Sequence, residues 1–183
     1  MIRRPPRSTL SSSSAASDVY KRQGESARDV QTMTELRDLY QAVILDHNNN
    51  PRNFGKLTSA NRHAKGVNPL CGDQVNVFFS LDDARVKEVG FEGRGCAICM
   101  ASASIMTETV KHLSIVQADQ YVTAFCSLAG GEKSEVMEGL DLSTLKVLAG
   151  VKAYPARIKC ATLAWHTAHS ALSKGGARVT TET

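Results

Sequence analysis

Three cysteines and one aspartate lie where the sequence indicates that structural elements begin or end. Cys71 and Asp73 belong to the string NPLCGD, Cys96 to GRGC, and Cys160 to ARIKC. Side chains at such positions can converge from distant parts of a chain. Three thiolates and one carboxylate form a complete tetrahedral ligand set for Zn²⁺ or for an iron centre. We therefore predict a metal site made of Cys71, Asp73, Cys96 and Cys160.

The expected positions of these thiols also favour the thiolate form. Cys96 follows a strand and precedes a predicted helix, and Cys160 is expected at the start of the last helix. The positive end of a helix dipole stabilises a thiolate, which is the form that binds metal or attacks sulfur. Cys71 precedes Gly72 on a turn, so we expect it to be the most mobile nucleophile of the three.

The other cysteines and histidines carry weaker signals. Cys99 forms a CxxC pair with Cys96, but neither a βαβ pattern nor a second CxxC accompanies it, so we expect Cys99 to be packed in the core. Cys126 shares a helical face with apolar residues and is also expected to be a core residue. His166 and His169 have a spacing that would allow one metal to be shared, but no third ligand is evident nearby.

Composition excludes several classes of function. The chain has 183 residues, 42% of them apolar and 5% aromatic, and a net charge of +4. Residues 1–34 contribute +3 of that charge, so the remainder is almost neutral and gives no support for nucleic-acid binding. No run of 18 apolar residues predicts a membrane span. Five cysteines without a secretory signal indicate a reducing compartment, the cytoplasm.

The first residues differ from the rest of the chain. Residues 1–32 are rich in Arg and Ser, show no apolar periodicity, and are expected to be disordered. The string MIRRPPRSTLSSSSAASDVYKRQ resembles translated adapter sequence, so we interpret it as a non-native leader and Met33 as the true start. A mitochondrial transit peptide is the alternative, and only then would the location be mitochondrial.

Periodicity predicts an α+β domain over residues 33–175, followed by a flexible tail at 176–183. A small antiparallel sheet of about three strands should carry helices on one face. Strands are expected at 74–81 and 85–92, after a loop that reaches about Lys65. Helices are expected to begin at Thr34 and to cover 97–112, 116–128, 142–148 and 159–173.

The chain from about Thr34 to Ser173 resembles the SufU branch of the IscU/NifU-like family of iron–sulfur cluster assembly proteins. Four motifs in the same order carry this resemblance: ILDHNNNPRNFG, NPLCGD, GRGCAICMASASIM and YPARIKCATLAWHT. Lys159 precedes Cys160, where IscU-type scaffolds carry a His, and the chaperone-recognition string of those scaffolds is absent. The 64 positions between Cys96 and Cys160 leave room for the insertion that is typical of SufU. Cys99 departs from the family pattern, in which Ser is more usual.

The resemblance implies a zinc-bound sulfur acceptor. It implies that Cys71, Asp73, Cys96 and Cys160 bind Zn²⁺, and that Cys71 takes persulfide sulfur from a PLP-dependent, SufS-like cysteine desulfurase. The sulfur would then pass to a downstream iron–sulfur assembly scaffold. Arg157 and Lys159 are candidates to stabilise negative charge or to pair with Asp73. The alternative is an IscU-type scaffold, on which the same residues hold iron or a transient [2Fe–2S] cluster.

We predict that residues 1–32 are dispensable, because no core pattern includes them. A chain that starts at Met33 should fold, bind metal and stimulate a cognate desulfurase like the full chain. Circular dichroism, metal analysis and a desulfurase assay would check this. Loss of folding on truncation would overturn the prediction, and mitochondrial import of a reporter carrying residues 1–32 would support the transit peptide instead.

Overall fold

The computed structural model describes residues 34–131, 139–173 and 178–181. The predicted leader at 1–32 lies outside these residues, as does most of the polar stretch that follows Gly131. Residues 38–183 form one compact unit by themselves, and the account below concerns that unit. No helix in the described part of the chain combines the length and the apolar character needed to cross a membrane.

The sheet is built from an antiparallel meander. Strands β1 (Arg62–Asn68), β2 (Asp73–Asp82) and β3 (Arg85–Arg94) pair in sequence order, and a short strand β4 (Val179–Thr180) runs parallel to β1 on its other side. The prediction of an α+β fold with a small sheet is confirmed. The fourth strand makes the sheet mixed rather than purely antiparallel.

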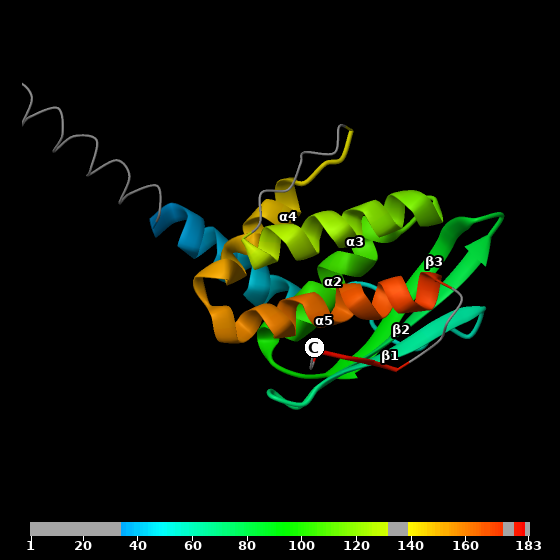
Figure 1. Ribbon diagram of the computed structural model, residues 1–183, viewed down its shortest axis with the longest axis horizontal. Coiled ribbons are helices and arrows are strands. Elements are labelled where there is room, and N and C mark those ends of the chain that lie inside the picture. The colour runs from blue at the N-terminus through cyan, green and yellow to red at the C-terminus, as the bar shows by residue number, and fades with distance from the viewer. Residues whose placement is uncertain (1–33, 132–138, 174–177, 182–183) are drawn as a thin grey trace, which may run out of the picture. The chain divides into compact units, whose positions relative to one another are not determined.

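Helices cover one face of this sheet (Figure 1). Residues 34–49 are helical, and the elements that follow the meander are α2 (Ala97–Val110), α3 (Ile115–Gly130), α4 (Ser143–Leu148), a 3₁₀ turn η1 (Ala149–Ala153) and α5 (Pro155–Leu172). Ser114 caps α3 in a capping box with Gln117, which satisfies the free N–H groups at that end.

Two boundaries differ from those predicted. Helix α5 begins at Pro155 rather than Lys159, because proline suits the first helical position, where its missing N–H costs nothing. The loop predicted to reach about Lys65 contains the first half of β1, whose buried positions are Ala64, Gly66 and Asn68. Small and polar residues on the buried face of a strand leave no apolar alternation to detect.

The C-terminal stretch also differs from the predicted flexible tail. In its described part, Val179 pairs with Gly66 and Thr180 with Val67, and the backbone N–H of Thr181 donates to Val67 O at 3.3 Å. These are main-chain contacts, which need no particular side chain and therefore give almost no signal in the sequence.

The core lies between the sheet and helices α2, α3 and α5. The Trp165 ring is fully buried and stacks on Phe125, with ring centroids 4.6 Å apart. Trp165 Nε1 donates to Ser102 Oγ at 3.0 Å, and that hydroxyl donates to Ala161 O at 2.5 Å. The relay links α2 to α5, so the two helices that carry Cys96 and Cys160 keep a fixed spacing.

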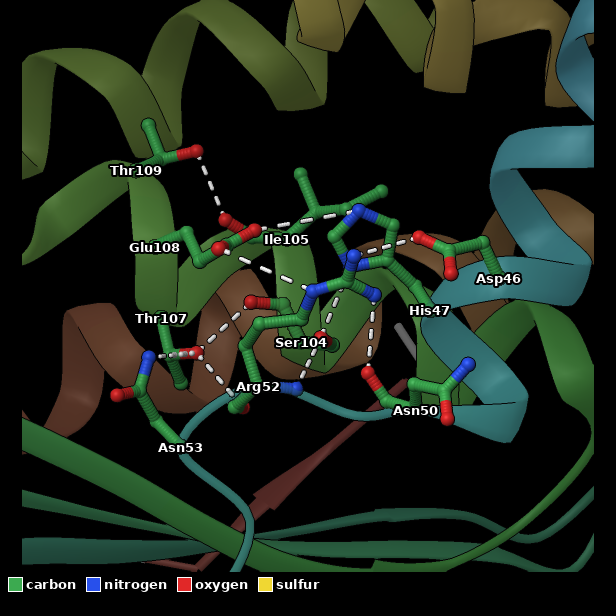
Figure 2. A network of polar contacts seen from close by, with 10 residues as sticks. All are labelled: Asp46, His47, Asn50, Arg52, Asn53, Ser104, Ile105, Thr107, Glu108 and Thr109. Atoms are coloured by element: carbon green, nitrogen blue, oxygen red, sulfur yellow. Dashed lines mark hydrogen bonds and ion pairs between the residues drawn. The ribbon is translucent and has the colours of Figure 1, made fainter.

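A polar network attaches the NNNPRNFG segment to α2 (Figure 2). The buried Ser104 hydroxyl lies 2.9 Å from His47 Nδ1 and accepts from the Arg52 N–H at 2.8 Å. Asn53 Nδ2 donates to Thr107 Oγ1 at 3.1 Å. Burial and the nearby Arg52 lower the pKa of His47, which keeps its ring neutral and suited to this contact.

The same segment then reaches the sheet. The Gly55 N–H donates to Phe91 O at 2.7 Å, and the Phe91 N–H donates to Asn53 O at 3.1 Å. Phe54 packs edge-on against Phe91. The motif ILDHNNNPRNFG therefore has an architectural role in this fold: it holds the first helix against α2 and β3.

We predict that Gly66→Ala destabilises the protein by about 1–3 kcal/mol, the usual cost of overpacking. A Cβ at this position would lie 2.0 Å from Thr167 Oγ1 and 3.0 Å from Leu163 Cδ1. Adding Thr167→Ala should recover part of the loss by removing the closest atom. Urea unfolding measures the effect.

The matched control is Gly130→Ala, because a Cβ there meets no atom within 4 Å. It should leave the free energy of unfolding unchanged or raise it by up to about 1 kcal/mol, since alanine favours the helix. Equal stability of the two alanine variants would contradict close packing of β1 on α5.

Candidate metal centre

Three separate segments bring thiols and a carboxylate to one end of the sheet. Cys71 lies in the turn between β1 and β2, and Asp73 is the first residue of β2. Cys96 is the N-cap residue of α2, directly after β3. Cys160 lies on α5, which packs on β1 and β2. The antiparallel meander places the start of β2 beside the end of β3, which explains why Asp73 and Cys96 are neighbours.

The ligand atoms of Cys71, Asp73 and Cys160 all lie within 4.8 Å of one another. The sulfurs of Cys71 and Cys160 are 3.1 Å apart, which is too far for a disulfide bond of about 2.05 Å. Cys96 Sγ lies 4.0 Å from Asp73 Oδ2, so the fourth predicted ligand contacts this group through the carboxylate. The structure thus groups Cys71, Asp73 and Cys160 and places Cys96 beside Asp73.

Asp73 is fully buried, and its carboxylate is held by the backbone. The Cys96 N–H donates to Asp73 Oδ1 at 2.9 Å. Gly95 makes this approach possible, because a Cβ on that residue would lie 2.7 Å from the same oxygen. A buried carboxylate lowers the free energy of unfolding unless it is paired. The segment around Asp73 therefore needs the segment around Cys96, which supplies the N–H donor.

Cys160 is also buried, and its environment differs from the predicted one. Because α5 begins at Pro155, Cys160 lies in the second turn, beyond the first turn in which a helix dipole acts. Burial raises the pKa of its thiol, and the contacts with Cys71 and Asp73 raise it further. Asn68 Nδ2 donates to Cys160 Sγ at 3.5 Å.

Asn68 is a site residue that the sequence reasoning missed. It is fully buried at the end of β1, beside the Cys160 sulfur. The sequence feature that pointed to Asn68 is its place as the first residue of the string NPLCGD, three residues before Cys71. Its side chain also accepts from the Leu70 N–H at 3.2 Å, so Asn68 shapes the turn that carries Cys71.

Cys71 is the exposed member of the group. The Arg157 guanidinium, in the first turn of α5, donates to Cys71 Sγ at 3.6 Å. Of the two basic residues proposed to stabilise negative charge, Arg157 therefore has a contact that fits this role.

The remaining cysteines match the prediction only in part. Cys99 is fully buried, and burial raises the pKa of its thiol, as expected of a core residue. Cys126 is half-buried rather than enclosed, and its sulfur lies 3.8 Å from His166 Nε2. The expectation that Cys126 has only apolar neighbours is wrong, because the packing of α3 on α5 brings a histidine beside it.

The donor set suits zinc better than a harder cation. Thiolates and a carboxylate oxygen are ligands of Zn²⁺ at about 2.0–2.3 Å, whereas Mg²⁺ and Ca²⁺ take oxygen. The exposed Cys71 leaves the group open to solvent on one side. A site with that opening suits an exchangeable ligand position rather than a closed structural site.

Comparison with known proteins identifies the family. Residues 39–161 match the model of the NifU-like N-terminal domain. The chain is 41% identical over 143 residues to the zinc-dependent sulfurtransferase SufU of Bacillus subtilis, covering 78% of this chain and 92% of that protein. It is 32% identical over 142 residues to the iron–sulfur cluster assembly scaffold protein IscU of Streptococcus pyogenes, covering 78% and 87% respectively.

A solved structure gives the same result. The crystal structure of FiSufU from Fervidobacterium islandicum superposes with a TM-score of 0.65 at 30% identity, covering 71% of this chain and 93% of that one. The family match at 39–161 covers most of the first helix, the meander, α2 and the start of α5, and it includes all four predicted ligand residues. From its sequence and its fold together, the chain belongs to the family of NifU-like N-terminal domains.

Proposed function

We propose that this protein is a zinc-dependent sulfur acceptor that receives persulfide sulfur on Cys71 and passes it to iron–sulfur cluster assembly. The observation that carries the proposal is the unequal exposure of the grouped residues. Cys71 is exposed, whereas Asp73 and Cys160 are buried. An incoming sulfur donor therefore reaches Cys71 first.

In this proposal one residue of the group, Cys71, reacts, and the others bind the metal ion or position its ligands. Cys71, Asp73, Cys96 and Cys160 would hold the zinc ion. When bound, zinc keeps a coordinating sulfur deprotonated at neutral pH. Arg157 adds a positive charge 3.6 Å from Cys71 Sγ, and Asn68 holds Cys160 in place. These contacts place a positive charge beside the exposed sulfur and hold the buried Cys160 sulfur in position.

The transfer itself is a thiol exchange. The Cys71 thiolate attacks the terminal sulfur of a persulfide on the donor enzyme. A sulfur–sulfur bond forms at Cys71 as the donor's sulfur–sulfur bond breaks, and the donor cysteine leaves as a thiolate. No net oxidation occurs, because one sulfane sulfur moves from one thiol to another.

The donor is a PLP-dependent, SufS-like cysteine desulfurase, and a downstream assembly scaffold takes the sulfur. The surface next to Cys71 suits a protein partner, because the neighbouring Leu70 side chain is 72% exposed. Apolar side chains beside a reactive thiol can be covered when a partner docks. We place this activity in the cytoplasm, a reducing compartment where thiols remain free.

A scaffold that holds a [2Fe–2S] cluster on the same residues is the competing function. The similarity to IscU of Streptococcus pyogenes is the observation in its favour. Metal analysis of protein purified without oxygen or chelator separates the two. Zinc at one or more per chain supports sulfur transfer, and iron with inorganic sulfide supports the scaffold.

We predict that Cys71→Ser abolishes stimulation of a cognate desulfurase, because serine cannot accept sulfane sulfur. After incubation of the wild type with desulfurase and cysteine, mass spectrometry should find one extra sulfur on the Cys71 peptide. Cys99→Ala, which removes a buried thiol one turn from Cys96, is the control and should retain transfer. A sulfur adduct on another cysteine, with Cys71→Ser fully active, would contradict the assigned roles.

We predict that metal removal lowers the melting temperature, because the ligands come from three segments that meet only in the folded chain. Binding at 1,000 times Kd contributes about 4 kcal/mol, which corresponds to about 8–16 °C in a domain of this size. Calorimetry before and after chelation, with zinc added back, measures the shift.

Cys160→Ser should lower stability more than Cys71→Ser, since water can replace an exposed ligand and cannot enter a buried one. An unchanged melting curve after verified metal removal would count against a four-ligand site.

A further inference from the structure

A second group of metal-binding side chains lies on helices α3 and α5, away from Cys71. Phe125 and Trp165 stack in the core between the two helices. Cys126 follows Phe125 on α3, and His166 follows Trp165 on α5, so both lie at the edge of this contact between the helices. There Cys126 Sγ lies 3.8 Å from His166 Nε2. Cys126 is half-buried and His166 is exposed, so an ion can reach the pair from solvent.

This separation fits two ligands of one zinc ion. Zinc binds cysteine sulfur at about 2.3 Å and histidine nitrogen at about 2.0–2.1 Å. At a tetrahedral angle these bond lengths place the two ligand atoms about 3.6 Å apart. The 3.8 Å between Cys126 Sγ and His166 Nε2 needs only a slightly wider angle.

Of these two groups, the imidazole is ready to bind a metal at neutral pH, whereas the thiol must first lose its proton. Burial raises the pKa of Cys126 to about 12, and burial with the nearby His169 lowers the pKa of His166. At neutral pH the imidazole is therefore uncharged, and its nitrogen can donate a lone pair. A bound zinc ion would take the sulfur as thiolate, and the thiol proton would leave to solvent.

His169 can supply a third ligand once its ring turns. It lies one turn beyond His166 on the same face of α5. Its Nδ1 contacts Asp119 Oδ1 on α3, which leaves Nε2 as the free donor. A carboxylate on the second ring nitrogen is the usual support of a zinc-binding histidine. The side chains of His169 and Asp119 are 54% and 45% exposed, so the ring and its supporting carboxylate can move together toward His166.

We propose that Cys126, His166 and His169 form a second zinc site, in which Asp119 positions His169 and water completes the coordination. The site is separate from the first one, because His166 lies six residues beyond Cys160, about 9 Å along the helix axis. In the part of the chain that the structure describes, the group with all ligand atoms already within 4.8 Å is Cys71, Asp73 and Cys160. The second site therefore closes only when His169 turns.

Cobalt binding to the full chain loaded with one equivalent of zinc tests the proposal. With the first site filled, added Co²⁺ should bind one further equivalent and give a sulfur-to-cobalt charge-transfer absorption. Cys126→Ser should abolish that absorption. His166→Gln should weaken cobalt binding at least tenfold, and Asp119→Asn should weaken it by roughly 10–100-fold, as loss of a supporting carboxylate does elsewhere.

His63→Gln and Asp82→Asn are matched controls at exposed positions on the sheet, and both should bind cobalt like the wild type. The zinc content of each variant is measured alongside and should stay near one per chain. Absence of a second equivalent, or equal absorption in Cys126→Ser, would overturn the proposal. Cobalt binding that occurs only as zinc is released would also overturn the proposal, because cobalt would then occupy the first site.

Discussion

The buried carboxylate of Asp73 is the constraint on which the rest of this structure depends. It is fully removed from solvent at the start of β2, where an unpaired charge would be very costly. Its protein partner is the Cys96 N–H, which lies at the head of α2. The carboxylate therefore requires the β2–β3 hairpin to be in register and the strand-to-helix junction to lie over it. It also requires glycine at position 95, since any side chain there would occupy the space of the carboxylate.

The helices supply the rigidity that this arrangement needs. The Trp165–Ser102–Ala161 relay joins α2 to α5, and the contacts around Ser104 join the first helix to α2. Because the polar groups in both places are buried and bonded, moving either helix would leave them unsatisfied. Cys96 and Cys160 are thus carried by a fixed pair of helices, whereas Cys71 is carried by a turn.

That difference between rigid and accessible residues is what a sulfur carrier needs. A transferable sulfur must sit on a thiol that a partner can touch, while the ligands that keep the site assembled must stay out of reach. Cys71 meets the first condition by its exposure and by its contact with Arg157. Cys160 and Asp73 meet the second by their burial. The same fold could hold a cluster on these residues, and the relatives of this chain include proteins named for each role.

The sequence by itself determined the fold class and most of the elements, and it singled out the candidate ligands. Cysteine and aspartate at element ends, apolar alternation in β2 and β3, and helical periodicity after Gly95 are local signals that need no partner. The tertiary structure alone decided the rest. Strand β1 has Ala64, Gly66 and Asn68 on its buried face, and β4 is held by main-chain bonds, so neither carries an apolar pattern. Proximity of Asn68 to Cys160, and of Cys126 to His166, depends on which helix packs where, across 92 and 40 positions of sequence. Packing between distant segments creates such contacts, and residue types along the chain do not record them.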